Sequence, residues 1–257
     1  MSNQQCEALD CAARQPSSRR KIAGRIGATL VRWALPQLCE LCVQRTEGAL
    51  LCAACNADLA RVTAACPVCA LPSQGSEICG TCVADRPPYR STVAALVYTF
   101  PADRLLQRIK YGGRLALACW AGDTLAAAAC ASLAARRSEL LPDRIVALPL
   151  AEKRQRERGY NQAREIAVRV AEATGLPMAT PLARTTAGVP QAALPWAERR
   201  KNVRGAFAVQ RNVRDARIAL VDDVMTTGAT LGEATRVLLS SGARFVECWV
   251  VARTLPP

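Results

Sequence analysis

Four C-x-x-C pairs follow one another near the start of the chain, and they constrain its folding more than any other feature. They are CELC at 39–42, CAAC at 52–55, CPVC at 66–69 and CGTC at 79–82. A segment this short, with few large apolar side chains, cannot bury a core of its own. The 257-residue chain contains no histidine, so cysteine thiolates are the natural ligands for a metal ion that would hold the segment together.

Two zinc ions, each bound by four thiolates, account for this spacing. One tight turn presents two thiolates to an ion, and a second turn completes the tetrahedron. An interleaved pairing of the turns is one alternative, and a redox role for one pair is another. Sites closed by four protein ligands are structural, and each would contribute about 10 kcal/mol to folding. Pairing in chain order predicts one site of Cys39, Cys42, Cys52 and Cys55 and a second of Cys66, Cys69, Cys79 and Cys82.

The sequence divides into three parts around these cysteines. Residues 1–38 form an N-terminal extension in which Ile22, Ile26, Leu30 and Trp33 recur at helical spacing. We expect an amphipathic helix that docks on its own protein, with attachment to a membrane surface as the alternative. Residues 39–85 form the double zinc ribbon, and residues 90–257 form a larger domain.

The larger domain alternates between apolar, β-branched runs and helical stretches. This alternation predicts an α/β fold with a mainly parallel sheet flanked by helices. Ligands bind such sheets at the carboxyl ends of the strands. We expect strands at 91–100, 144–150, 217–224 and 244–253, one or two helices within 101–137, and further helices at 161–175 and 228–242.

Charge and apolar runs restrict location and partners. The net charge of +13 favours an anionic partner, either a phosphorylated small molecule or nucleic acid, although solubility alone is the simpler explanation. The Ala-rich run from Leu115 to Ala135 is interrupted by Gly122, Asp123 and Thr124, and no signal peptide is evident. We therefore expect a soluble, cytoplasmic protein without an integral membrane segment.

The stretch VDDVMTTGATL at 221–231 carries the clearest chemistry. After an apolar strand, residues 226–230 would form a loop whose N–H groups converge in front of a helix N-terminus, which is a phosphate cradle. Asp222 and Asp223 would repel a phosphate, but as hydrogen-bond acceptors they match the vicinal diol of a sugar. A sugar phosphate satisfies both halves of the motif. Alternatively, Asp223 is a turn residue and Thr226 or Thr227 caps the helix.

This stretch resembles the binding motif for 5-phosphoribosyl-1-pyrophosphate (PRPP) in type I phosphoribosyltransferases. PLAEKRQRERGYNQAREIA at 149–167 and RTTAGVPQAALPWAERRKNVRGAF at 184–207 resemble two segments of the ComF competence family. The cysteine pairs match that family's double zinc ribbon, and the resemblance covers about residues 20–255. One departure is Ala151, where many relatives have histidine, which puts any proton relay there in doubt.

The resemblance implies roles for individual residues. Asp222 and Asp223 would hold the ribose diol during catalysis. Lys110 and Tyr111 in IKYGG match a further family stretch, with a structural role as the alternative. The 5-phosphate would bind Thr226, Thr227, Gly228, Ala229 and Thr230. The 1-pyrophosphate, with Mg²⁺, would bind Lys153, Arg154 and Arg158, unless these are only a solvated helix start. A mobile loop would contribute Arg184, Gln191, Arg199 and Asn202.

Two functions follow from the resemblance. The first is a Mg²⁺-dependent phosphoribosyltransferase, related to amidophosphoribosyltransferases, that acts on PRPP and an unidentified acceptor. The second is a PRPP- or nucleotide-binding accessory protein without turnover. Either would serve natural competence and DNA uptake, with single-stranded DNA, a competence helicase and recombination-loading proteins as expected partners.

Overall fold

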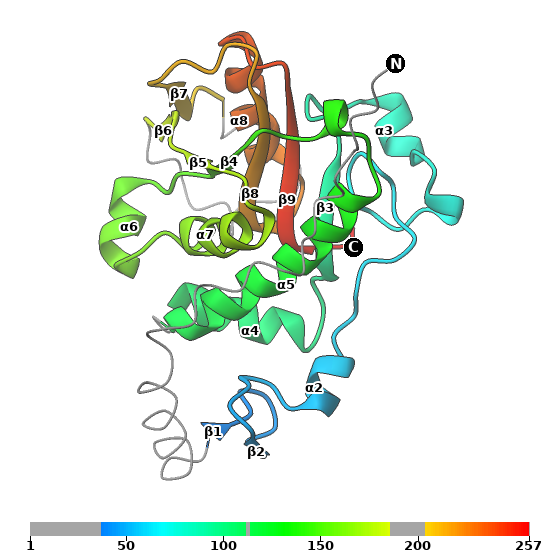
Figure 1. Ribbon diagram of the computed structural model, residues 1–257, viewed down its shortest axis with the longest axis vertical. Helices are drawn as coiled ribbons and strands as arrows, with labels where there is room; N and C mark the ends of the chain where they lie inside the picture. Colours follow the sequence, from blue (N-terminus) through cyan, green and yellow to red (C-terminus); the bar gives the residue numbers. More distant parts are fainter. Residues whose placement is uncertain (1–36, 112–113, 186–203, 257) are drawn as a thin grey trace, which may run out of the picture.

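The computed structural model describes residues 37–111, 114–185 and 204–256, so most of the N-terminal extension lies outside the described residues. A parallel five-stranded sheet forms its centre, with strand order β3-β9-β8-β4-β5 (Figure 1). The strands are β3 (Thr92–Val97), β4 (Arg144–Ala147), β5 (Met178–Ala179), β8 (Arg217–Met225) and β9 (Phe245–Arg253). The two long strands, β8 and β9, are therefore central and carry strands on both sides.

Helices cover both faces of the sheet. On β8, Ala219 and Val221 join the core beneath α4 (Ala102–Tyr111), α5 (Leu115–Ala134) and α7 (Gln162–Thr174). Ile218 and Leu220 point to the other face, which is covered by α8 (Ala229–Ser240) and a small antiparallel pair of β6 (Leu182–Arg184) and β7 (Phe207–Val209). This alternation along one strand is what two buried faces require. The predicted α/β fold is confirmed.

Helices α4 and α5 occupy the stretch 101–137, as predicted, but α5 is more continuous in its apolar character than expected. It is one helix of 20 residues, and by length and composition it is able to cross a membrane. Within the structure, Leu117, Ala121 and Leu125 are instead fully buried in the core. A Cβ at Gly122 would lie 2.6 Å from the Cβ of Arg169 on α7, so glycine permits the close approach of the two helices.

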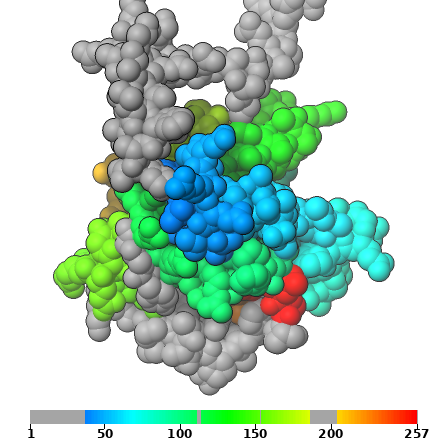
Figure 2. Space-filling model, turned by 90° about the horizontal axis from the view of Figure 1, so that it is seen from below, coloured from blue at the N-terminus to red at the C-terminus, as the bar shows by residue number. Residues whose placement is uncertain are grey.

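The cysteine-rich segment forms two small units that pack on opposite faces of the large domain. The first contains β1 (Gln37–Leu38), β2 (Arg45–Thr46) and α2 (Ala53–Ala57), and its Leu51 and Leu59 join the core beneath α4 and α5. In Figure 2 this unit, in blue, lies over the green segment that includes α4. The second contains the 3-10 turn Gln74–Ser76 and α3 (Gly80–Ala84), and its Val68 joins the core beneath α8. The apolar side chains of each ribbon are thus buried against the sheet domain and not in a core of the ribbon itself.

The connection between the two ribbons also protects the edge of the sheet. Val62 donates its backbone N–H to Ala95 at 3.2 Å, and Val97 donates to Ala60 at 2.8 Å. Arg61 forms an antiparallel bridge with Leu96 on β3. An uncovered strand edge invites pairing with other chains, and this short segment occupies it.

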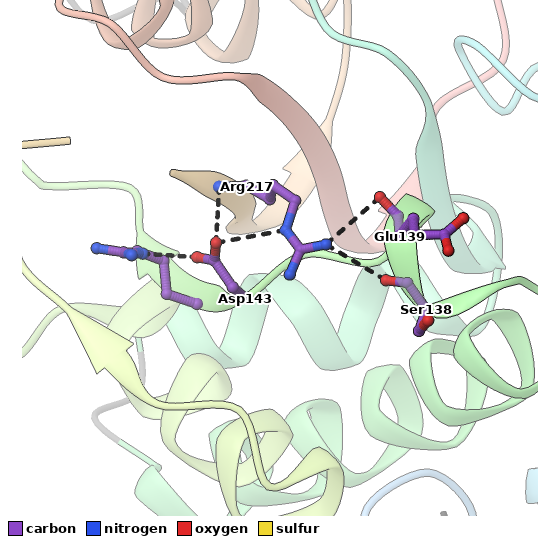
Figure 3. A network of polar contacts seen from close by, with 5 residues as sticks. Ser138, Glu139, Asp143 and Arg217 are labelled. Atoms are coloured by element: carbon purple, nitrogen blue, oxygen red, sulfur yellow. Dashed lines mark hydrogen bonds and ion pairs between the residues drawn. The ribbon is translucent and has the colours of Figure 1, made fainter. Parts of the chain in front are cut away.

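A polar network fixes the amino ends of the central strands. Asp143 accepts from the Nε of Arg144 at 2.7 Å and from the backbone N–H of Arg217 at 3.2 Å (Figure 3). Arg217 also donates to the carbonyls of Ser138 and Glu139, in the 3-10 turn Ser138–Leu140. Burial opposes the charge on Asp143, but the two arginines lower its pKa below the ordinary value. This network lies at the end of β4 and β8 opposite to the carboxyl ends, so it is structural.

A second ion pair is buried between α5 and β9. Glu247 is fully buried on β9, and Arg136, just beyond α5, donates to its two carboxylate oxygens at 2.6 and 3.0 Å. A bidentate arginine of this kind satisfies a carboxylate that no water reaches.

Replacing Arg136 with methionine is expected to lower the free energy of unfolding by about 3 kcal/mol, because Glu247 would remain buried without a partner. The double variant R136M/E247L should recover part of this loss, since the uncompensated charge is gone. Urea unfolding monitored by circular dichroism measures both. Equal stability of R136M and the double variant would contradict this account.

Candidate functional site

The loop after β8 is a tight turn between a strand and a helix, which is the local arrangement that a phosphate cradle requires. Strand β8 ends at Met225, Gly228 adopts φ of 77°, and α8 begins at Ala229. The positive φ favours glycine, and a Cβ at Gly228 would also lie 2.8 Å from the hydroxyl of Tyr89. The first N–H groups of a helix have no intrahelical acceptors, and the helix dipole makes this end positive. The turn therefore presents donors to an anion.

The alternative of a helix cap is also met in part. The Thr227 hydroxyl accepts from the backbone N–H of Ala229 at 3.2 Å. This bond orders the turn and is compatible with a ligand in front of it, because the N–H groups of the following residues remain at the helix end. The contact of Thr226–Thr230 with a phosphate stays a prediction.

A cavity of about 420 Å³ opens beside this loop, at the carboxyl ends of β4 and β8. Its position agrees with the rule for ligand sites in parallel sheets. Three groups of side chains face it: an acidic pair with a lysine, a set of arginines, and the turn itself. The charged residues in its lining are Lys110, Arg154, Arg158, Arg184, Asp222 and Asp223.

The two adjacent acids, Asp222 and Asp223, have different electrostatic environments. Burial and the neighbouring Asp223 raise the pKa of Asp222 to about 8, so this carboxyl is mostly protonated at neutral pH. Asp223 faces Lys110, whose Nζ lies 3.0 Å from its Oδ2. Burial opposes the charge on Lys110, but Asp223 more than compensates and the pKa of Lys110 is raised. The pair thus offers one carboxyl able to donate a hydrogen bond and one carboxylate that accepts.

Arginines from two elements face the same cavity. Arg154 and Arg158 lie on the short helix α6 (Glu152–Arg158), and Arg184 ends β6 with its guanidinium 5.4 Å from the Phe207 ring centre. Burial, and then the charge of Arg154, lower the pKa of Arg184. Like charges gathered at a cavity wall are stabilised by an anion. Pyrophosphate has the charge and size for this wall, and the role of these arginines stays a prediction.

The other predicted site residues are placed as follows. Arg184 belongs to β6 rather than to a loop, and Gln191, Arg199 and Asn202 lie outside the described residues. Lys153 belongs to α6, and its side chain lies outside the described part of the chain. Ala151 is buried at the start of α6, where its methyl group makes no hydrogen bond.

Asn161 and Tyr160 hold α6, the helix that carries Arg154 and Arg158, against the sheet. The Asn161 side chain caps α7 by accepting from the N–H of Ala163 at 3.0 Å, and it donates to the Leu148 carbonyl at 3.1 Å. Tyr160 donates to the Ile109 carbonyl on α4 at 2.6 Å. These bonds fix the turn between α6 and α7 relative to β4 and α4, and so they position the arginines.

The eight paired cysteines form two clusters in chain order. Within each, the four sulfur atoms lie within 4.8 Å of one another. The sulfur atoms of Cys42 and Cys52, and those of Cys69 and Cys79, are 3.6 Å apart. Tetrahedral Zn²⁺ with Zn–S bonds of about 2.3 Å places sulfurs about 3.8 Å apart, so both clusters fit zinc. The interleaved pairing is not what the structure shows.

In each cluster, a backbone N–H group donates to one sulfur atom and stabilises its thiolate form. Cys39 accepts from the N–H of Cys52, and Cys66 from that of Cys79, both at 3.4 Å. Although burial opposes the thiolate, the backbone N–H groups lower the pKa of Cys39 to about 6 and that of Cys66 to about 7. Thiolates of this kind are the form that binds metal.

Comparison with known proteins agrees with both halves of the structure. Residues 30–83 match the family described as "Double zinc ribbon domain", and residues 150–255 match "Phosphoribosyl transferase domain". DNA utilization protein YhgH of Salmonella typhimurium is 34% identical over 172 residues, which cover 66% of this chain and 74% of that protein. Competence protein F of Haemophilus influenzae is 34% identical over 163 residues, 61% of this chain and 69% of that protein. The chain belongs to the ComF family.

Solved structures resemble this ComF-family chain more distantly. Glutamine PRPP amidotransferase from B. subtilis is 22% identical with a TM-score of 0.34, over 52% of this chain and 25% of that one. Purine phosphoribosyltransferase from Pyrococcus horikoshii is 20% identical with a TM-score of 0.34, over 52% of this chain and 73% of that one.

The charged residues of the ComF-family site were predictable to different degrees. Lys110 belongs to IKYGG, a stretch for which a structural role was the alternative, and its contact with Asp223 joins α4 to β8. Arg184 was expected in a loop, although it lies beside Arg154. Only pairing of distant segments brings these groups together, and no local pattern encodes it.

Purified protein is expected to contain two zinc ions per chain, and C39S or C66S should each remove one. Loss of either ion should expose the apolar side chains that its ribbon packs on the sheet domain and lower thermal stability. Elemental analysis and thermal unfolding with and without a chelator measure this. A single ion in the unmodified protein would contradict the two-cluster arrangement.

The raised pKa of Asp222 predicts a pH-dependent stability. The folded state binds this proton more tightly than the unfolded chain, whose value is about 3.9, so stability falls as pH rises from about 4 toward 8. A single proton contributes at most about 1.4 kcal/mol per pH unit. Between about pH 6 and pH 8.5, D222N should lose less stability than the unmodified protein in urea unfolding. Equal pH slopes would show that Asp222 ionises in the folded state as it does in a peptide.

Proposed function

We propose that this ComF-family protein binds PRPP in the cavity at the end of β8 and transfers its phosphoribosyl group to an acceptor. The observation that carries the proposal is the order of charges along the cavity wall. The turn at Gly228 offers N–H donors, the Asp222–Asp223 pair offers a donor and an acceptor, and three arginines offer positive charge. A sugar with a phosphate at one end, a diol and a pyrophosphate presents the matching groups.

Each group would have a separate task. The turn 226–230 would hold the 5-phosphate through backbone N–H groups. Asp223 would accept from one ribose hydroxyl, and protonated Asp222 would donate to the other. Arg154, Arg158 and Arg184 would stabilise the charge that develops on the departing pyrophosphate. Mg²⁺ prefers phosphate oxygens and water to a cage of protein ligands, so it would arrive bound to the pyrophosphate and neutralise part of its charge.

The transfer needs no covalent intermediate with the protein. The bond from C1 to the pyrophosphate oxygen breaks, and its electron pair leaves with pyrophosphate. The lone pair of the acceptor forms the new bond at C1, and the acceptor loses a proton. Positioning and electrostatics account for such a reaction, which suits a chain without histidine. We propose that the reaction takes place in the cytoplasm during competence and DNA uptake.

A second candidate function is binding of single-stranded DNA by a protein that holds PRPP without turnover, in contact with a competence helicase and recombination-loading proteins. A cleft of about 710 Å³ between the second ribbon and α8 favours it. The cleft is lined by the exposed Arg86, Arg204 and Arg236, together with the acidic Asp85 and Glu233. Exposed arginines suit the phosphate backbone of a nucleic-acid strand, and the names of the relatives refer to DNA utilization and competence.

The experiment that separates these functions follows pyrophosphate release from PRPP and Mg²⁺, with and without nucleobases or cell extract. Acceptor-dependent release that falls at least about a hundredfold in D223A supports the transferase, because a lost contact to the reacting sugar costs about 3 kcal/mol. D103A, in the first turn of α4 and not in the lining of the cavity, is the matched control and should behave as the unmodified protein.

PRPP binding without release, together with binding of single-stranded DNA that weakens steeply with salt, supports the second function instead. Isothermal titration calorimetry measures the first and fluorescence anisotropy the second. A protein with no affinity for PRPP or for ribose 5-phosphate would overturn both.

A further inference from the structure

Arg253, the last residue of β9, joins the second zinc ribbon to the turn after β8. Its side chain is 4% exposed. The Nε donates to the carbonyl of Cys69 at 2.7 Å, and Nη1 donates to the carbonyl of Met225 at 3.0 Å and to that of Thr226. One guanidinium thus binds the backbone of a zinc ligand and the backbone of the proposed phosphate turn.

The guanidinium of Arg253 binds backbone carbonyls. In the described part of the chain, its acceptors are backbone carbonyls, including that of Thr254 at 2.9 Å, and not a carboxylate. A buried charge without a carboxylate partner is costly, whereas Zn²⁺ with four thiolates carries a net negative charge. Metal bound in the second cluster would therefore supply negative charge on the Cys69 side of Arg253.

Tyr89 forms a second contact between the same parts. Its side chain is 4% exposed and packs in one core with Cys69, Cys82 and Met225. Its hydroxyl lies where a Cβ on Gly228 would meet it at 2.8 Å. The turn is therefore supported from behind by a residue that leads directly out of the second ribbon.

We propose that Arg253 is a positioning residue that holds the phosphate turn in its binding geometry, and that the metal in the Cys66–Cys82 cluster sets the affinity of the turn through it. This inference rests on the proposed phosphoribosyl site. Without metal in the cluster, the backbone around Cys69 is no longer fixed, and the carbonyl that accepts from the Nε of Arg253 is no longer held in place. The turn then loses the donor that fixes the carbonyls of Met225 and Thr226, and the N–H groups beyond them no longer converge.

The first ribbon provides an internal comparison. Its Glu40 pairs with Arg108 on α4 and with Arg114, at 3.3 and 2.6 Å. These contacts lead to α4 and not to the turn after β8. Loss of the first metal should therefore leave phosphate affinity much less affected than loss of the second.

Coupling between two sites is reciprocal. If the metal in the second cluster strengthens phosphate binding, then a phosphate ligand must strengthen metal binding in that cluster by the same factor. Ribose 5-phosphate should therefore slow the loss of zinc from the second cluster to a chelator, and leave the loss from the first cluster unchanged. This readout does not depend on activity.

The test compares two ligands that engage opposite ends of the cavity. In R253M, calorimetry should show ribose 5-phosphate binding weakened at least about tenfold, as expected when charge-assisted hydrogen bonds that order a turn are lost. Inorganic pyrophosphate, which needs the arginines of α6 and β6, should change less than about twofold. R136M is the matched control, because it removes a half-buried arginine that bonds a fully buried carboxylate. It should leave both affinities unchanged although it lowers stability.

Two further measurements keep the proposal falsifiable if R253M does not fold. R253K keeps the charge with fewer donors and should weaken ribose 5-phosphate selectively but less. Zinc release is followed in C39S/C42S, which retains only the second cluster, and in C79S/C82S, which retains only the first, each with and without ribose 5-phosphate. Protection of the second cluster alone supports the coupling.

Equal weakening of both ligands in R253M or R253K, or no protection of zinc, would overturn the inference while leaving the proposed function intact. An unmodified protein that binds neither ribose 5-phosphate nor PRPP would instead mean that the proposed function itself is wrong, and the inference with it.

Discussion

The central position of β8 in the sheet is the constraint on which the site depends. With β9 on one side and β4 on the other, its residues from Ile218 to Val221 are fully buried on both faces. A strand held in this way has one register and one end point, because a slip of one residue would exchange the two core faces. The carboxylates of Asp222 and Asp223 therefore emerge at a fixed place, and the turn to α8 follows at a fixed distance.

Because β8 is fixed, the acidic residues and the arginines line the same cavity from different elements. Asp222 and Asp223 sit side by side on β8, and the structure relieves their repulsion in two ways. Asp222 stays mostly protonated, and Asp223 binds the ammonium group of the half-buried Lys110. Arg154 and Arg158 lie on α6, which follows β4 in the chain, and Arg184 lies on β6, which follows β5. Two acids that together carry little net charge are compatible with an anionic ligand, whereas two full carboxylates would repel it.

The sequence predicted the local parts of this site and not the contacts between distant parts. The cysteine spacing indicated two clusters, and VDDVMTTGATL indicated a strand, a tight turn and a helix, because each of these depends on neighbours in the chain. Arg253 bonds to Cys69 across 184 positions, and Lys110 meets Asp223 from another element. Neither contact leaves a periodic or compositional signal.

Gly122 and Arg184 are two residues whose local sequence suggested a different role from the one that the structure gives them. In the sequence, Gly122 indicates only an interruption of an Ala-rich apolar run, but it permits the close approach of α5 to Arg169 on α7. Arg184 opens a segment with the composition of a loop, yet it pairs with Phe207 in an antiparallel ladder. In both cases tertiary packing outweighs local preference.

The two ribbons have a common physical role despite their different positions. An Ala- and Val-rich core with few aromatic residues packs small side chains, and its rigidity depends on what clamps its edges. One ribbon covers α4, which carries Lys110, and the other contacts β9 and the turn after β8 through Arg253. Each cysteine cluster therefore lies next to an element that leads to the cavity. Metal binding supplies folding energy that such short segments do not obtain from apolar burial, so metal in these clusters would stabilise the elements around the proposed site.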